Sequence, residues 1–185
     1  ILILLYAFFL LFIFAYSIMQ LSLALAYSKQ KKAVKKTSCS MEDKEWPRVT
    51  IQLPVYNELY VVERLLASIA KMDYDKSKLD IQLLDDSTDE SFQVAAVKVK
   101  ALQALGFDIS HIQRPERKGY KAGALAYGMQ RIKGEFIAIF DADFVPDPLF
   151  LRKTIPHFYA SDEIGVVQTR WQHLNKNYSF LTKLQ

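Results

Sequence analysis

The sequence is poor in the residues that build disulfide bonds and zinc sites. Among 185 residues there is one cysteine, Cys39, which excludes an internal disulfide and a thiolate zinc site. The three histidines, His111, His157 and His173, are scattered and form no metal-ligand pattern. Apolar residues make up 51% and charged residues 24% of the chain, which excludes a disordered or collagen-like protein.

Charge is absent from residues 1–27. As a helix this run would span roughly 40 Å, more than the hydrocarbon core of a bilayer at roughly 30 Å. It also lacks the polar stripe of a soluble helix. We therefore expect one transmembrane helix over residues 1–27. A cleaved signal peptide is the alternative, because residues 24–26 resemble a cleavage site, but the run is too long for one.

A basic juxtamembrane linker is expected over residues 28–46. Its first part carries five lysines, Lys29, Lys31, Lys32, Lys35 and Lys36. Lysines directly after a span favour the cytoplasmic side. We expect an integral protein of the plasma membrane or the bacterial inner membrane, with lysines near the lipid headgroups and the remainder in the cytoplasm. Residues 47–185 hold 18 basic and 17 acidic residues, so no basic surplus indicates a nucleic-acid partner.

From residue 48 onwards, short apolar runs alternate with helical patterns. This alternation predicts an α/β domain with a mostly parallel sheet. The apolar run 136–140 is typical of a strand covered on both faces. The expected strands are residues 49–53, 79–84, 109–113, 136–140 and 164–168, and the expected helices are residues 59–72, 92–105, 122–132 and 148–158.

Polar residues that could carry chemistry follow the expected strands. Ligands of open parallel sheets bind at the carboxyl ends of the strands. Asp141 and Asp143 follow the strand 136–140, and in an extended chain residues two apart point to the same side. Two like charges so placed repel unless a cation lies beside them, and a hard divalent ion that also holds phosphates would remove the repulsion. The alternative is a solvated turn in which Asp143 caps the next helix.

Acidic and aromatic groups follow the first two strands. Asp85 or Asp86 could accept a hydrogen bond from the ring N–H of a base such as uracil, because a carboxylate only accepts. Tyr56 offers a flat face for the same ring. The alternatives are a turn or helix-cap role for the two acids and edge packing for Tyr56.

A basic loop follows the third expected strand. Arg117, Lys118 and Lys121 could neutralise a diphosphate near a helix N-terminus, with Gly119 and Gly123 allowing close backbone approach. The alternative is a solvated run of charges.

Four motifs follow one another along the sequence. They are Leu53-Pro54-Val55-Tyr56-Asn57-Glu58, Asp85-Asp86-Ser87-Thr88-Asp89, Gly119-Tyr120-Lys121-Ala122-Gly123-Ala124-Leu125 and Phe140-Asp141-Ala142-Asp143. In this order and spacing they resemble the processive family 2 glycosyltransferases. These cellulose-synthase-like membrane enzymes carry a GT-A catalytic domain, Rossmann-like in fold, between transmembrane helices. The stretch 167–175 resembles their glucan and mannan synthase-like branch.

The resemblance implies that residues 47–185 are the donor-binding part of a GT-A domain. It implies a nucleotide-sugar donor, usually a UDP-sugar, a glycan acceptor, inverting transfer in polysaccharide synthesis, and Mg²⁺ or Mn²⁺. Asp141 and Asp143 would hold the metal. The implied nucleotide-sugar-binding residues are Tyr56, Glu58, Asp85, Asp86, Lys121 and Asp141.

Two family elements are missing from the sequence. In the family, the catalytic base lies in a Thr-Glu-Asp motif, and the acceptor motif Gln-x-x-Arg-Trp follows it. Neither motif occurs in this sequence. Gln168-Thr169-Arg170-Trp171 is one residue too short to be that motif. The sequence also begins inside an apolar run and ends within a helical pattern. We therefore expect a fragment, clipped at both ends, that is inactive alone.

Two rival functions use the same acidic residues. A haloacid-dehalogenase-like phosphatase has a nucleophile motif similar to residues 140–145, but that motif should follow the first strand. A membrane-tethered receiver or nucleotide-sensing module would need a lysine at the end of a later strand, where Thr169 and Arg170 stand.

Overall fold

The computed structural model describes residues 1–33, 41, 46–170 and 178–184. The chain divides into two units, Ile1–Ser38 and Cys39–Gln185, and each is described by itself. The second unit alternates strands and helices, as predicted. Its elements are β1 (Val49–Val55), α2 (Val62–Ile69), the 3-10 turn η2 (Lys76–Lys78), β2 (Leu79–Asp85), α3 (Ser91–Ala104), β3 (Asp108–Ile112), α4 (Tyr120–Met129), β4 (Phe136–Ile139), α5 (Phe150–Phe158) and α6 (Phe180–Leu184).

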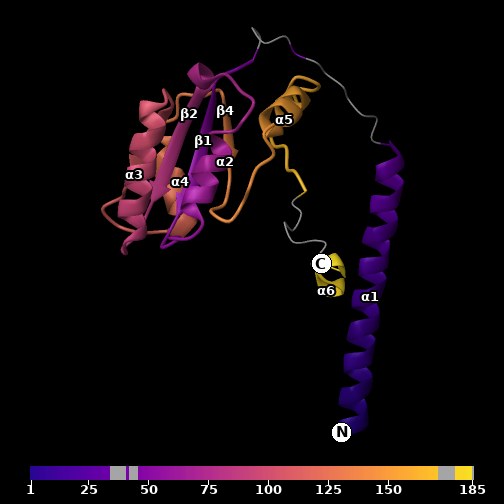
Figure 1. Cartoon of the computed structure of the whole chain (residues 1–185). Helices are drawn as coiled ribbons and strands as arrows, with labels where there is room; N and C mark the ends of the chain where they lie inside the picture. Colours follow the sequence, from indigo (N-terminus) through magenta and orange to yellow (C-terminus); the bar gives the residue numbers. More distant parts are fainter. Residues whose placement is uncertain (34–40, 42–45, 171–177, 185) are drawn as a thin grey trace. The chain divides into compact units, whose positions relative to one another are not determined.

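The four strands form one parallel sheet in the order β3-β2-β1-β4 (Figure 1). The predicted parallel sheet is therefore confirmed. In the register of β1 and β2, Val49 lies beside Leu79 and Val55 beside Asp85. Both strands thus end at the same edge of the sheet. The loops that follow them start side by side there, and this edge is where a parallel sheet binds its ligands.

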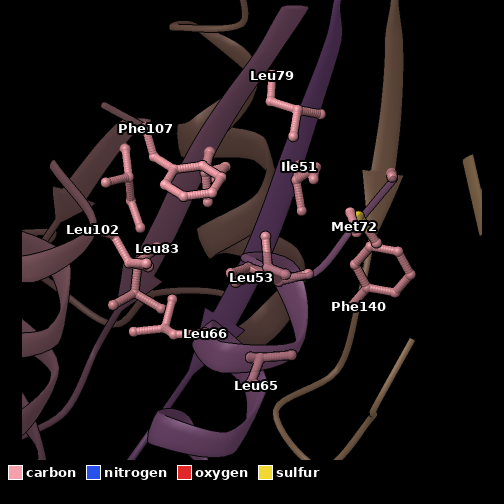
Figure 2. Close-up of a cluster of buried hydrophobic side chains, with 14 of the residues drawn as sticks. Ile51, Leu53, Leu65, Leu66, Met72, Leu79, Leu83, Leu102, Phe107 and Phe140 are labelled. Atoms are coloured by element: carbon pink, nitrogen blue, oxygen red, sulfur yellow. The ribbon is translucent and has the colours of Figure 1, made fainter. Parts of the chain in front are cut away.

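One face of the sheet is apolar because the strand residues alternate in character. The side chains of Ile51 and Leu53 on β1, and of Leu79 and Leu83 on β2, are fully buried. Figure 2 shows them gathered with Leu65 and Leu66 of α2 and with Leu102 of α3. Each fully buried side chain of this size contributes about 1.5–3 kcal/mol. This face holds the sheet and the two helices together.

The opposite face is polar yet also buried, beneath α4. Thr50 Oγ1 donates to Asp80 Oδ2 at 2.8 Å, and Gln52 Nε2 donates to Gln82 Oε1 at 3.1 Å. Helix α4 contacts both strands here. It comes close because residue 128 is glycine: a Cβ there would lie 2.6 Å from the Gln52 amide nitrogen. The sheet thereby fixes the position of α4, whose first turn reaches the carboxyl edge.

Two expectations about the later strands are wrong. Residues 164–168 form no strand, and Val166 is 83% exposed. A strand needs a hydrogen-bonded neighbour, and in the described part of the chain none lies beside this segment. Strand β4 is not covered on both faces either, because Ile139 is 50% exposed. It is the last strand of the sheet and pairs only with β1 within the described residues.

In the first unit the described residues form one long helix, α1 (Leu2–Ala33). Its part Leu2–Lys29 is long and apolar enough to cross a membrane. Helices of signal sequences near an N-terminus share these properties, so the span remains a prediction. Most of the predicted basic linker, including Cys39, lies outside the described residues, as does the stretch 171–175.

Candidate functional site

A pocket of about 310 Å³ opens at the carboxyl edge of the sheet. It combines an aromatic ring, carboxylates and basic side chains, as the sequence predicts. Of the six predicted nucleotide-sugar-binding residues, all except Asp85 line it, and both predicted metal ligands do. The lining residues are Pro54, Val55, Tyr56, Glu58, Asp86, Arg117, Lys121, Ala124, Asp141, Ala142 and Asp143.

Asp86 is held in place by a buried partner. Arg114 Nε and Nη2 donate to its two carboxylate oxygens at 2.9 and 2.5 Å. Both side chains are 7% exposed. The hydrogen bond to Asp86 raises the pKa of the Arg114 guanidinium, which keeps the guanidinium charged. Such a two-pronged contact fixes the plane of the carboxylate before any ligand arrives.

Arg114 also holds the loop that follows it. Its Nη1 donates to the carbonyl oxygen of Lys118 at 2.8 Å, and its Nη2 to that of Tyr120 at 3.1 Å. One guanidinium therefore connects Asp86 to the basic loop. The sequence places Arg114 directly after the third strand, but neither its charge nor its neighbours distinguish it from a solvated residue.

Asp85 lies behind the pocket rather than in it. Its side chain is fully buried, accepts from Ser87 N at 2.9 Å and lies 2.7 Å from His111 Nε2. Burial alone would raise the pKa of Asp85, but hydrogen bonds from His111 and Ser87 outweigh it and hold the pKa below its usual value. The ring of Phe92 stacks on His111 at 4.5 Å between centroids. In this structure Asp85 supports the loop and does not face the cavity.

The loops after β1 and β2 are tied to each other. Asn57 N donates to Ser87 Oγ at 2.9 Å, and Thr88 N donates to Asn57 Oδ1 at 3.0 Å. Asn57 has a φ of 55°, a conformation that asparagine tolerates better than most residues. The tie fixes the backbone on both sides of the pocket entrance and so positions Tyr56 near Asp86.

The acidic pair lies in a turn, not in an extended chain as expected. Phe144 N donates to Asp141 O at 3.1 Å, which closes the turn that contains Asp143. Both carboxylates still line the pocket. No group of three or more metal-binding side chains occurs among the described residues. Two carboxylates fit Mg²⁺ or Mn²⁺ when a substrate diphosphate and water supply the other oxygens, which is the usual arrangement for Mg²⁺.

Lys121 lies in the first turn of α4 and forms an ion pair with Asp141. Both side chains are about half exposed, at 53% and 45%. Gly119, with a φ of 74°, precedes the helix, and Gly123 is needed because a Cβ there would lie 2.0 Å from the carbonyl oxygen of Lys118. The glycine at this position thus lets the helix pack against the preceding loop, and the predicted close approach of a diphosphate stays a prediction. The Lys121 ammonium group lies beside the Asp141 carboxylate, which would also attract a divalent ion.

The aromatic side of the pocket holds Tyr56 and a guanidinium. The Tyr56 ring is 38% exposed, and the Arg117 guanidinium carbon lies 3.4 Å from its centroid. Glu58 also lines the pocket. Lys118 does not line the pocket; its carbonyl oxygen instead accepts from Arg114. The predicted basic loop thus contributes two of its three side chains, Arg117 and Lys121.

An open parallel sheet with a polar pocket at its carboxyl edge is typical of nucleotide-binding α/β proteins. The chain belongs to glycosyl transferase family 2, whose model matches residues 50–184. Family membership sets aside the phosphatase and the receiver-like module. The chain is 39% identical over 145 residues to probable glucomannan 4-beta-mannosyltransferase 7 of Oryza sativa subsp. japonica, a match that covers 76% of this chain and 25% of the relative.

A second relative is probable glucomannan 4-beta-mannosyltransferase 15 of Arabidopsis thaliana. It is 33% identical over 168 residues, which cover 86% of this chain and 31% of the relative. The chain therefore spans between a quarter and a third of the length of these curated relatives. The predicted resemblance to the cellulose-synthase-like enzymes is confirmed.

Solved structures confirm the GT-A fold. Mannosyltransferase PcManGT from Pyrobaculum calidifontis, in complex with GDP-Man and Mn²⁺, is 30% identical with a TM-score of 0.61, covering 73% of this chain and 39% of that one. S. aureus TarS 1-349 in complex with UDP-GlcNAc is 20% identical with a TM-score of 0.53, covering 65% and 37%. At that identity the second likeness shows the fold alone.

Proposed function

We propose that this chain is the donor-binding part of a membrane-bound glycosyltransferase. The whole protein would transfer a sugar from a nucleoside diphosphate sugar to a glycan acceptor, with inversion, in polysaccharide synthesis. The observation that carries the proposal is one pocket that joins a fixed carboxylate and an aromatic ring to two further carboxylates and a lysine. The first pair suits a base, and the second group suits a metal-bound diphosphate.

Each side chain has a task in this proposal. Asp86 accepts from the base, Tyr56 stacks on it, and Lys121 contacts the phosphates. Asp141 and Asp143 would hold Mg²⁺ or Mn²⁺, which when bound would neutralise the diphosphate leaving group. Glu58, which lines the same pocket, is suited to accept a hydrogen bond from a hydroxyl group of the nucleotide sugar. Asp85 holds the loop that carries Asp86 in position and does not contact the donor. The general base would have to come from outside this sequence, so we expect the chain alone not to transfer sugar.

We infer that GDP-mannose is the first donor to test. The two relatives named above are mannosyltransferases, and the solved neighbour at 30% identity holds GDP-Man. Each Asp86 oxygen already accepts once from Arg114 and has capacity for one more donor. Guanine offers two adjacent N–H donors to such a carboxylate, whereas uracil offers one. A UDP-sugar, as the motif resemblance implies, is the second candidate.

Competition between nucleotides tests the donor class. The whole chain in detergent, with Mn²⁺, should bind GDP or UDP at least about tenfold more tightly than ADP, because adenine presents no ring N–H to Asp86. GDP tighter than UDP supports a mannosyl donor, and the reverse order supports a UDP-sugar. Equal binding of all three would contradict base recognition by Asp86.

We further propose that α1 spans the membrane and that the second unit is cytoplasmic. The length and hydropathy of Leu2–Lys29 and the five lysines that follow support this orientation. Labelling of Cys39 in intact cells tests it, because Cys39 is the sole thiol. Labelling by an impermeant reagent from outside would refute the orientation.

A further inference from the structure

Arg117 occupies a position that the proposed function assigns to the donor. Its guanidinium carbon lies 3.4 Å from the Tyr56 ring centroid and 5.0 Å from that of Tyr120. The first distance is a stacking distance, the same at which a nucleotide base would lie. Arg117 and Tyr56 both line the pocket. A base and this guanidinium therefore cannot occupy the same face of Tyr56 together.

We propose that Arg117 covers the base-stacking face of Tyr56 in the empty site and is displaced from it by the base of the donor. The guanidinium then moves to the diphosphate. This inference rests on the proposed function, since it requires a nucleotide in this pocket. It assigns Arg117 a role in choosing between ligands with and without phosphates.

The position of Arg117 in the chain permits this movement. It is exposed and lies in the loop before α4, three residues before Tyr120. The same cavity is lined by Lys121 and Asp141, where the diphosphate would lie, so the guanidinium stays within one pocket. Arg114, in contrast, is buried and fixed by Asp86. The loop thus carries one fixed and one movable guanidinium.

The two contacts of Arg117 differ in strength. The contact of a cation with an exposed aromatic ring favours the stacked over the displaced position of the cation by a factor of about two to five. A guanidinium on a phosphate forms charge-assisted, often two-pronged hydrogen bonds, which are stronger. The exchange is therefore favourable when the ligand brings phosphates. A nucleoside without phosphates must also displace Arg117, but it offers the displaced guanidinium no phosphate to bind.

The substitution Arg117→Ala gives opposite effects on two ligands. In the whole chain in detergent with Mn²⁺, guanosine should bind about two- to fivefold more tightly, because its stacking face is already free. GDP should bind about threefold or more weakly, because a phosphate contact is lost. Binding is measured by calorimetry for GDP and by saturation-transfer NMR for guanosine, with uridine and UDP as a parallel pair.

Two further variants make the test specific. Arg131→Ala removes a guanidinium that lies 4.3 Å from the centroid of the Tyr127 ring, outside the pocket. It should change the affinity for neither guanosine nor GDP. In a Tyr56→Leu background the gain for guanosine from Arg117→Ala should vanish, while the loss for GDP should persist.

The other possible results contradict either the role of Arg117 or the proposed function itself. If Arg117→Ala weakens guanosine and GDP equally, the guanidinium sandwiches the base and the proposal is wrong. If it changes neither, or if the gain survives without the Tyr56 ring, the proposal is also overturned. If the unsubstituted chain binds neither GDP nor UDP, the proposed function itself fails.

Discussion

The two ends of the pocket are built in different ways. At the base end, which is the end proposed to bind the base, Asp86 and Arg114 are 7% exposed and doubly hydrogen-bonded, and behind them Asp85 is fully buried against His111. At the phosphate end, which is the end proposed to bind the diphosphate, Asp141 and Lys121 are about half exposed and form an ion pair. The base end is thus preorganised, which suits selection of a fixed planar group. The phosphate end is held by an exposed pair of little strength, which can exchange partners when a metal and a diphosphate arrive.

The largest effect should come from breaking the buried pair at the base end. Arg114→Ala leaves Asp86 buried without its counter-charge, so the free energy of unfolding should fall by about 3–5 kcal/mol. Urea unfolding of the whole chain in detergent, followed by tryptophan fluorescence, measures it. Lys153→Ala is the control, because its pair with Asp147 is more than half exposed and should contribute less than about 1 kcal/mol. Equal losses in both variants would mean that the buried pair stabilises the fold no more than an exposed one.

A milder change at the same end should alter ligand choice. Asp86→Asn keeps the shape of the side chain but replaces one acceptor oxygen by an NH2 group, which donates. The preference of the chain for GDP or UDP over ADP should fall by about tenfold to a hundredfold, because a hydrogen bond to a charged group is lost. Affinity for Mn²⁺, measured in parallel, should stay unchanged. If the full preference survives, Asp86 is a turn residue and does not read the base.

Asp85 should affect stability rather than ligand choice. Asp85→Asn should lower the free energy of unfolding by about 1–3 kcal/mol at pH 7, because buried hydrogen bonds are weakened. The folded protein holds the pKa of Asp85 below its ordinary value, so its contribution is present above about pH 4 and is lost as the pH falls through the lower, folded value. The difference between the two proteins should therefore shrink on acidification below about pH 4. A difference that stays constant with pH would contradict the lowered pKa of Asp85.

The smallest effect should come from the exposed pair. Lys121→Ala frees Asp141, so Mn²⁺ binding without nucleotide should tighten by about two- to fivefold. Electron paramagnetic resonance of free Mn²⁺ measures it, and Arg131→Ala controls for the loss of one positive charge. Weaker Mn²⁺ binding in Lys121→Ala would mean that the lysine supports the metal ligands instead of competing for them.

The sequence predicts the fold better where a segment carries its own pattern. The strands β1 and β2 and the helix α3 follow from apolar periodicity alone, and the motif residues meet at one edge because parallel strands end together. Residues 164–168 show the limit: their apolar pattern is that of a strand, but a strand also requires a partner, which a local pattern does not contain.

The pocket shows the same limit at the level of single residues. Tyr56, Asp86, Asp141 and Asp143 were predictable from their positions after strands. The burial of Asp85 was not, because adjacent residues in a strand point to opposite sides and the register of the loop decides which one reaches the cavity. The sequence alone does not single out Arg114, because its importance lies in its partner, 28 residues away in the chain.

Metal-dependent binding of a nucleoside diphosphate tests the central claim most directly. Calorimetric titration of the whole chain with GDP, and in parallel with UDP, would be run in Mn²⁺ and again in EDTA. We expect binding in Mn²⁺ that is at least about tenfold weaker in EDTA, and Asp143→Asn in Mn²⁺ should bind as weakly as the unsubstituted chain in EDTA, because one of two charged ligands is lost. Equal binding with and without the metal would contradict the assignment of Asp141 and Asp143 as the metal-holding end of a donor site.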